Sequence, residues 1–181
     1  MFPFDAEYVV TVKDLRKATY YSTVRERRKS FLLMFVAVSA AIVYAIAVSL
    51  GANLPGTFLY FIGGAYLIWG LIQFGKAEKS IRAYIKTESN LLEVPYKTTF
   101  TTSDMRMTVP SRGIDNKFGY GRVVYAFELS DIMMFYISGD QVYIVPKRAI
   151  PDEKQEALRG LLRKKLPGRF LSRFDKKEKD E

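Results

Sequence analysis

The chain has 181 residues, a net charge of +9, and neither Cys nor His. Without Cys it has no disulfide framework, thiolate metal site or cysteine nucleophile, and without His it lacks the usual general base and the commonest metal ligand. The excess of Lys and Arg is spread along the chain, so no segment has the composition of a nucleic-acid-binding arm. We expect no catalytic residue, no cofactor, no metal and no nucleic acid.

The N-terminal segment predicts a strand followed by a basic helix. Residues 4–12 (FDAEYVVTV) carry an apolar side chain at every second position, which is typical of a half-buried strand. A helical pattern follows from Asp14 to Lys29 and is expected to continue, straight or slightly bent, into the next segment. Residues 1–30 should belong to the same domain as the C-terminal part of the chain, because a strand needs a partner.

The next segment has the composition of a membrane anchor. Residues 31–75 contain no Asp, Glu, Lys or Arg, although charged residues make up 26% of the chain. Residues 31–50 and 57–75 are each long enough, at about 1.5 Å per residue, to cross the roughly 30 Å hydrocarbon core of a bilayer as a helix. The turn at 51–56 contains Gly, Asn and Pro, which break helices. We predict a two-helix transmembrane hairpin.

Lys and Arg flank both open ends of this hairpin, and the turn has none. Basic flanks stay on the cytoplasmic side, so both termini are expected in the cytoplasm. Two alternatives remain. A buried helix pair in a soluble protein would need more covering chain, and a signal peptide cleaved near Ala47 would have an unusually long charged region.

Small residues recur in both predicted spans, where they let helix backbones approach closely. They are Ala37, Ala41 and Ala45 in the first span and Gly63, Gly64 and Gly70 in the second. Packing within the hairpin is the simpler explanation, and a seam for a second copy or a partner helix is the alternative.

After the hairpin, residues 76–91 keep helical spacing and should form a helical connector that stops near Asn90. From Val94 onward the period changes to two, which predicts strands separated by short turns. The expected strands are 96–100, 105–109, 122–129, 132–137 and 141–145, with a polar, glycine-rich loop at 110–121.

The last predicted element is an amphipathic helix from Asp152 to Leu166. Asp152 and Gln155 resemble a capping box at its start, and Pro167-Gly168 ends it. Residues 92–168 should therefore form a small antiparallel β domain capped by this helix, with the strand at 4–12 in the same sheet. Residues 169–181 are expected to be a charged tail.

The order of these parts, with IVPKR at residues 144–148 leading into a helix, resembles the YcxB-like family of bacterial membrane proteins. The resemblance implies a location in the bacterial inner (cytoplasmic) membrane and a cytoplasmic domain similar to a pleckstrin-homology barrel. It implies no established activity. The expected fold class is an α+β membrane protein, in which a multi-pass transmembrane hairpin carries a small antiparallel PH-like domain capped by a C-terminal helix.

Nothing in the sequence singles out a catalytic group. The acidic residues Asp104, Asp115, Glu128, Asp131 and Asp140 fall at turns or strand edges, where turn formation explains them. We predict a non-enzymatic adaptor that binds a lipid headgroup or a protein at the membrane. The alternative is a small accessory subunit of a larger membrane complex, and an enzyme that uses carboxylates alone ranks third.

Six cations are the candidate contacts for anionic membrane lipid or for an unidentified protein partner. They are Arg25, Arg27, Arg28, Lys29, Lys147 and Arg148. The simpler explanation of the first four is membrane topology, and that of the last two is a strand end before a helix. The lipid hypothesis rests on the attraction of about 1 kcal/mol between each juxtamembrane cation and an anionic leaflet. The sequence leaves the oligomeric state open.

Overall fold

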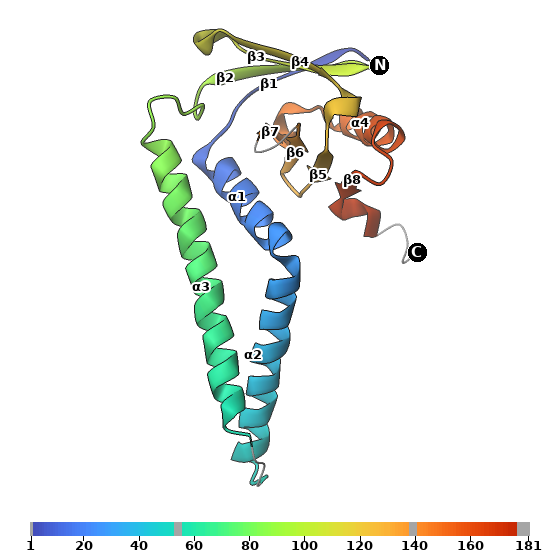
Figure 1. Ribbon diagram of the computed structural model, residues 1–181. Helices are drawn as coiled ribbons and strands as arrows, with labels where there is room; N and C mark the ends of the chain where they lie inside the picture. Colours follow the sequence, from blue (N-terminus) through green and yellow to red (C-terminus); the bar gives the residue numbers. More distant parts are fainter. Residues whose placement is uncertain (1, 53–55, 138–140, 177–181) are drawn as a thin grey trace. The chain divides into compact units, whose positions relative to one another are not determined.

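The computed structural model describes residues 2–52, 56–137 and 141–176 (Figure 1). It divides into two compact units, of which one comprises Met1–Ala18 with Ser89–Glu181 and the other Thr19–Glu88. We call the first unit the β domain and the second the hairpin. The N-terminal strand joins the C-terminal part of the chain as expected, but residues 19–30 group with the hairpin rather than with the β domain.

The first sheet of the β domain is antiparallel and has the strand order β1-β2-β3-β4. Its strands are β1 (Phe4–Val9), β2 (Pro95–Phe100), β3 (Asp104–Val109) and β4 (Ile114–Gly119). The predicted N-terminal strand and the predicted hairpin of β2 and β3 are confirmed. The period of two in β1 reflects two different surfaces, because Ala6 and Tyr8 are buried while Asp5 and Glu7 lie within ion-pair distance of Lys97.

The expected loop at 110–121 is wrong, because this segment contains β4. β4 pairs with β3 in a regular register that places Ile114 opposite Val109 and Phe118 opposite Met105. Between these two apolar residues the strand carries Asp115, Asn116 and Lys117, which hide the alternation. Charged residues are common on edge strands because they discourage pairing with another chain.

The second sheet has the order β7-β6-β5-β8. Its strands are β5 (Tyr125–Glu128), β6 (Ile132–Tyr136), β7 (Val142–Pro146) and β8 (Phe170–Ser172). The predicted meander of β5, β6 and β7 is confirmed, but our expectation that these strands share a sheet with β1 is wrong. The break at 138–140, including Asp140, lies outside the described residues.

The predicted charged tail contains a strand. β8 lies parallel to β5, with Ala126 opposite Phe170 and Glu128 opposite Ser172. Phe170 is buried in the core of the domain. Three residues are too short for a periodic signal, which is why the pattern of this strand is invisible in the sequence.

A single hydrophobic core fills the β domain and receives side chains from both sheets and from α4 (Asp152–Lys165). Leu158, Leu162 and Leu166 are fully buried, as the amphipathic pattern predicted. The expected capping box is wrong, because the N-cap residue is Pro151 and makes no side-chain cap hydrogen bond. Gln155 instead donates its amide to the Asp152 carboxylate and to the Ile150 carbonyl.

The helices of the chain are α1 (Val12–Glu26), α2 (Arg28–Ser49) and α3 (Phe58–Ile85), besides α4. The predicted passage from the basic helix into the first span is interrupted at Arg27, which lies between α1 and α2. α3 ends at Ile85, so the expected connector at 76–91 is helical only over its first part. The turn residues 53–55 lie outside the described residues.

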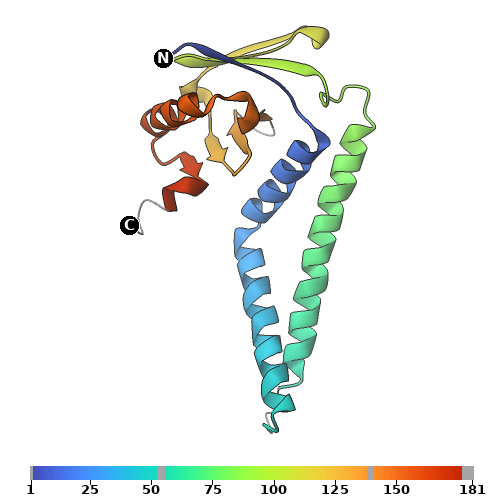
Figure 2. The ribbon, with the colours of Figure 1, turned by 180° about the vertical axis from the view of Figure 1, so that it is seen from behind.

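Both α2 and α3 are long and apolar enough to cross a membrane by length and composition. They run side by side in both views of the ribbon (Figures 1 and 2). The hairpin is packed through small residues, because a Cβ added to Gly63 would lie 2.6 Å from the Cβ of Ala41 and one added to Gly70 would lie 2.5 Å from Met34 Sδ.

Ala37 joins this contact through its carbonyl oxygen, 3.4 Å from the added Cβ of Gly63. Gly64 does not take part, since a Cβ added there would meet nothing within 4 Å. Ala45 is half-buried. The hairpin interior therefore accounts for Ala37, Ala41, Gly63 and Gly70.

Candidate functional site

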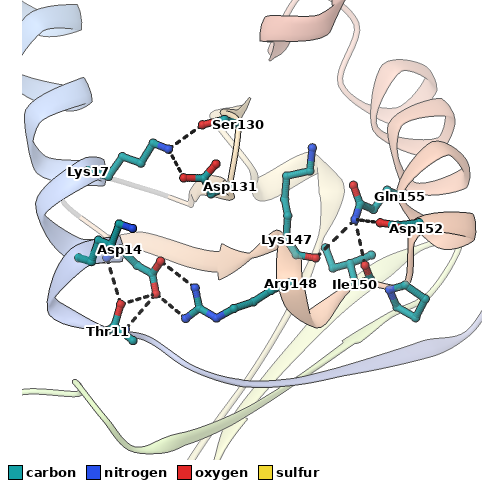
Figure 3. A pocket seen from close by; sticks show the side chains of 12 residues that line it. Thr11, Asp14, Lys17, Ser130, Asp131, Lys147, Arg148, Ile150, Asp152 and Gln155 are labelled. Atoms are coloured by element: carbon teal, nitrogen blue, oxygen red, sulfur yellow. Dashed lines mark hydrogen bonds and ion pairs between the residues drawn. The ribbon is translucent and has the colours of Figure 1, made fainter.

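A groove of about 650 Å³ opens in the β domain (Figure 3). Its walls come from the start of α1, from the turn between β5 and β6, and from the connector between β7 and α4. Four cations and three carboxylates line it: Lys13, Lys17, Lys147 and Arg148, and Asp14, Asp131 and Asp152. Residues far apart in the sequence thus bring opposite charges to one surface.

One wall is built around Asp14, which lies in the first turn of α1. The Asp14 carboxylate accepts hydrogen bonds from the backbone N–H of Thr11 at 3.0 Å and from its hydroxyl at 2.9 Å, while the Asp14 N–H donates to that hydroxyl at 3.3 Å. This reciprocal pattern is a capping box in which Asp takes the place of Glu or Gln. It fixes the first turn of α1 and aims the carboxylate into the groove.

Arg148 reaches the same carboxylate from the opposite wall. Its two terminal nitrogens donate to Asp14 at 3.0 and 2.6 Å, and one of them also donates to the Val9 carbonyl at 2.9 Å. Burial by itself raises the pKa of the Asp14 carboxyl, but the hydrogen bonds from Arg148 and Thr11 outweigh it and hold this pKa below its ordinary value. Arg148 therefore ties the start of α1 to the connector between β7 and α4.

Lys17 makes the second contact across the groove. Its ammonium donates to the Ser130 hydroxyl at 2.6 Å and forms an ion pair with Asp131. The hydrogen bond from Lys17 is the main reason why the pKa of the Asp131 carboxyl is lowered. Both partners are substantially exposed, so this pair contributes at most about 1 kcal/mol of stability.

Lys13 differs from the other groove cations. Its side chain is exposed, and within the described part of the chain it has no ion pair or hydrogen bond of its own. Its charge acts on the nearby Asp131 carboxylate, but a ligand can reach its ammonium without breaking a hydrogen bond or an ion pair.

Lys147 turns its side chain away from Arg148 (Figure 3) and into the β domain. There its ammonium donates to the fully buried Glu128 carboxylate at 2.7 Å, and Arg159 donates to the same carboxylate at 2.9 Å. The Ser172 hydroxyl completes the cluster at 2.7 Å. The expectation that Glu128 is an edge or turn residue is therefore wrong, because its strand lies between β6 and β8.

The cluster also shifts the pKa of the Glu128 carboxyl. Burial raises the pKa of this carboxyl, but the hydrogen bonds from Arg159, Lys147 and Ser172 outweigh the burial and lower the pKa. The Phe174 ring covers the cations, with Lys147 Nζ 4.3 Å and Arg159 Cζ 5.0 Å from its centroid. Lys147 is thus engaged with Glu128 inside the β domain, and its contact with lipid or a partner stays a prediction.

The four cations next to the first predicted span lie on the hairpin, outside the groove of the β domain. Arg25 lies in the last turn of α1, Arg27 lies at the break, and Arg28 and Lys29 open α2. Cations in the first turn of a helix interact unfavourably with its dipole, so the stability of α2 does not explain Arg28 and Lys29. They remain predicted contacts for lipid or a partner.

Among the described residues, no group of three or more Asp and Glu side chains is placed to hold a metal ion. The carboxylates of the groove each have a cationic or amide partner instead: Arg148 for Asp14, Lys17 for Asp131 and Gln155 for Asp152. The groove thus presents paired cations and carboxylates side by side.

Two sheets around a common core, together with two long apolar helices, define an α+β protein with a candidate membrane anchor. Residues 103–162 match the model of the YcxB-like protein family, which confirms the expected resemblance over this part of the chain. The matched segment runs from the start of β3 into α4 and contains Glu128, Lys147 and Arg159 of the buried cluster. No curated protein and no solved structure matches the chain.

Proposed function

We propose that this chain is a non-enzymatic protein of the bacterial inner membrane, in which the hairpin anchors the β domain at the cytoplasmic face. The groove of the β domain binds a segment of a partner protein that carries acidic side chains. In this proposal the domain is a PH-like module: its two sheets and the helix α4 share one core, which is the kind of arrangement that the family resemblance implies.

The hairpin supports the anchoring part of this proposal. Large apolar side chains such as Leu32, Phe35, Val43 and Phe61 are more than half exposed along α2 and α3. Water-soluble proteins rarely expose so much contiguous apolar surface, and a bilayer would cover it. Lys and Arg residues flank both open ends of the hairpin, and its turn contains none. This distribution supports cytoplasmic termini.

The observation that carries the binding part is the groove itself, whose polar groups converge from three separate segments of the β domain. Lys13 lines this groove without an ion pair or hydrogen bond among the described residues, and its charge acts on the nearby Asp131 carboxylate. A protein segment fits this mixture better than a lipid headgroup does, because the groove offers donors and acceptors side by side and Lys147 is engaged with Glu128.

The accessory-subunit alternative has less support from the small residues, although Gly64 is not used in the hairpin packing. It needed the small residues of the hairpin to face a partner helix, whereas Ala41, Gly63 and Gly70 are used inside the hairpin. We therefore place the partner contact on the β domain.

A binding assay with purified full-length protein in detergent micelles tests the proposal. The probes are a fluorescent peptide rich in Glu and Ser, the same peptide with Gln in place of Glu, and a water-soluble short-chain phosphatidylglycerol. We expect only the acidic peptide to bind, with an affinity that falls as salt rises. Lys13→Glu should weaken it about tenfold or more, because it replaces an attraction by a repulsion.

Lys164→Glu is the matched control, since this exposed residue of α4 lies outside the groove and the substitution changes the charge equally. Equal losses for Lys13→Glu and Lys164→Glu would show that the net charge, not the groove, binds the peptide. If the short-chain lipid binds and this binding depends on Lys13, the ligand of the groove is a lipid headgroup rather than a protein. If the protein turns over a substrate and loses this activity when one groove carboxylate is changed, it is an enzyme.

A further inference from the structure

The hairpin has a groove of its own, about 330 Å³ in volume, which falls within the range of small-ligand sites. Arg27, Ser30 and Leu33 line it from α2 and the break before it, and Ala65, Tyr66 and Trp69 line it from α3. Ser30 and Leu33 are three residues apart in α2, which places them on one face of this helix, and Arg27 lies just before its first turn.

The polar groups of this groove have unused hydrogen-bonding capacity. The Arg27 guanidinium, the Ser30 hydroxyl, the Tyr66 hydroxyl and the Trp69 indole N–H make no side-chain hydrogen bond or ion pair within the described chain. Arg and Trp can only donate, and no carboxylate lines the groove. A ligand that matches it must therefore supply acceptors, and next to Arg27 a negative charge.

The groove also changes in polarity along its length. The charged Arg27 immediately precedes α2, Ser30 follows in the first turn of this helix, and the apolar Leu33 comes three residues later. On α3, which runs in the opposite direction, Trp69 lies nearest to the charged end of the helix, followed by Tyr66 and Ala65. Trp and Tyr favour the depth at which headgroups meet acyl chains. The groove is thus charged at one end and apolar at the other, as a phospholipid is charged at its phosphate and apolar along its acyl chains.

We propose that this groove is a binding site for one anionic phospholipid, whose phosphate contacts Arg27 and Ser30 and whose acyl chain lies along Leu33 and Ala65. The site differs from the diffuse attraction of Arg25, Arg28 and Lys29 to an anionic leaflet, because it holds a lipid at a defined position. The proposal rests on the membrane insertion of the hairpin and is independent of the partner groove in the β domain.

A partner helix is a weaker match for this groove. The backbone carbonyls of a transmembrane helix are used within that helix, so it offers few free acceptors. A phosphodiester instead offers charged oxygen atoms, with which Arg forms strong hydrogen bonds.

Trp69 is the only tryptophan in the chain, so its fluorescence reports on this groove alone. The full-length protein is reconstituted in vesicles of phosphatidylcholine, and brominated phosphatidylglycerol or brominated phosphatidylcholine is added in increasing proportion. Bromine quenches tryptophan at short range, so the two quenching curves give the relative occupancy of the groove. We expect phosphatidylglycerol to be preferred about fivefold, which corresponds to the roughly 1 kcal/mol contributed by one juxtamembrane cation.

Arg27→Gln should abolish the preference, while Lys29→Gln should retain it, because both remove one exposed charge but only Arg27 lines the groove. Equal quenching by the two lipids in the unmodified protein would overturn the proposal. Equal losses for the two variants would overturn it as well, because diffuse attraction would then suffice. Absence of quenching by either lipid would contradict membrane insertion itself, which the partner assay in micelles does not test.

Discussion

In the β domain, buried Glu128 and Lys147 form an ion cluster with the half-buried Arg159, whereas in the hairpin α2 and α3 meet where Gly63 and Gly70 leave room for Ala41 and Met34. The ion cluster depends on charged groups that pair with one another. The helix contact depends on glycines, whose missing side chains let the two helices approach closely. The β domain should therefore be sensitive to removing a group, and the hairpin to adding one.

The largest loss should follow from Glu128→Ala in the β domain. The substitution leaves the Lys147 ammonium buried without a carboxylate, and removing one partner of a buried ion pair costs about 3–5 kcal/mol. Pulse proteolysis across a urea series measures the free energy of unfolding of the domain in the full-length protein. Glu156→Gln is the control: it removes the exposed partner of Arg159 and should cost less than about 1 kcal/mol. Similar costs for both variants would show that the buried cluster contributes little.

In the hairpin, Gly63→Ala should cost about 1–3 kcal/mol, because the added methyl group would have to displace Ala41 from a well-packed contact. Trp69 fluorescence during unfolding in mixed detergent micelles measures this change, since Trp69 packs on Phe31. Gly64→Ala should instead stabilise the hairpin. A Cβ added at Gly64 meets no atom within 4 Å, and alanine favours the helix over glycine by up to about 1 kcal/mol. Equal stabilities of these variants would contradict the proposed packing.

The smallest effect concerns the pair of Asp14 and Arg148 in the groove. A double-mutant cycle of Asp14→Asn and Arg148→Gln should give a coupling free energy of about 1 kcal/mol at pH 7. The pKa of Asp14 is lower in the folded state, so the unfolded chain binds more protons in the acid range. The contribution of Asp14 is therefore present above its unfolded pKa and is lost as the pH falls through the folded value. Additive effects of the two substitutions would mean that the pair only fills space.

The sequence predicted the helices and strands in which apolar side chains recur at a regular spacing. The strands β1, β2 and β3, the meander of β5 to β7, the two long helices and the buried face of α4 were all visible in this way. β4 was missed because its two apolar residues are separated by three polar ones, and β8 was missed because it has only three residues.

The candidate site was only partly predictable. IVPKR drew attention to Lys147 and Arg148, but the partners of these cations lie at Glu128 and Asp14, far away in the sequence. No local pattern indicates which carboxylate a cation will meet. Thr11 with Asp14 did offer a signal, since Thr-x-x-Asp before a helical pattern suggests a capping box.

The proposal that the hairpin anchors the β domain at the cytoplasmic face is tested most directly by the side of the membrane on which each part lies. The chain has no Cys, so a single introduced cysteine is the only residue that a maleimide can label. One variant is Ala52→Cys at the turn of the hairpin, and the other is Ser111→Cys on the exposed surface of the β domain. With a membrane-impermeant maleimide applied from outside, we expect Ala52→Cys to react in cells with a permeable outer envelope. Ser111→Cys should react only after the inner membrane is opened. Labelling of both positions from outside, or the reverse pattern, would contradict the anchored cytoplasmic module.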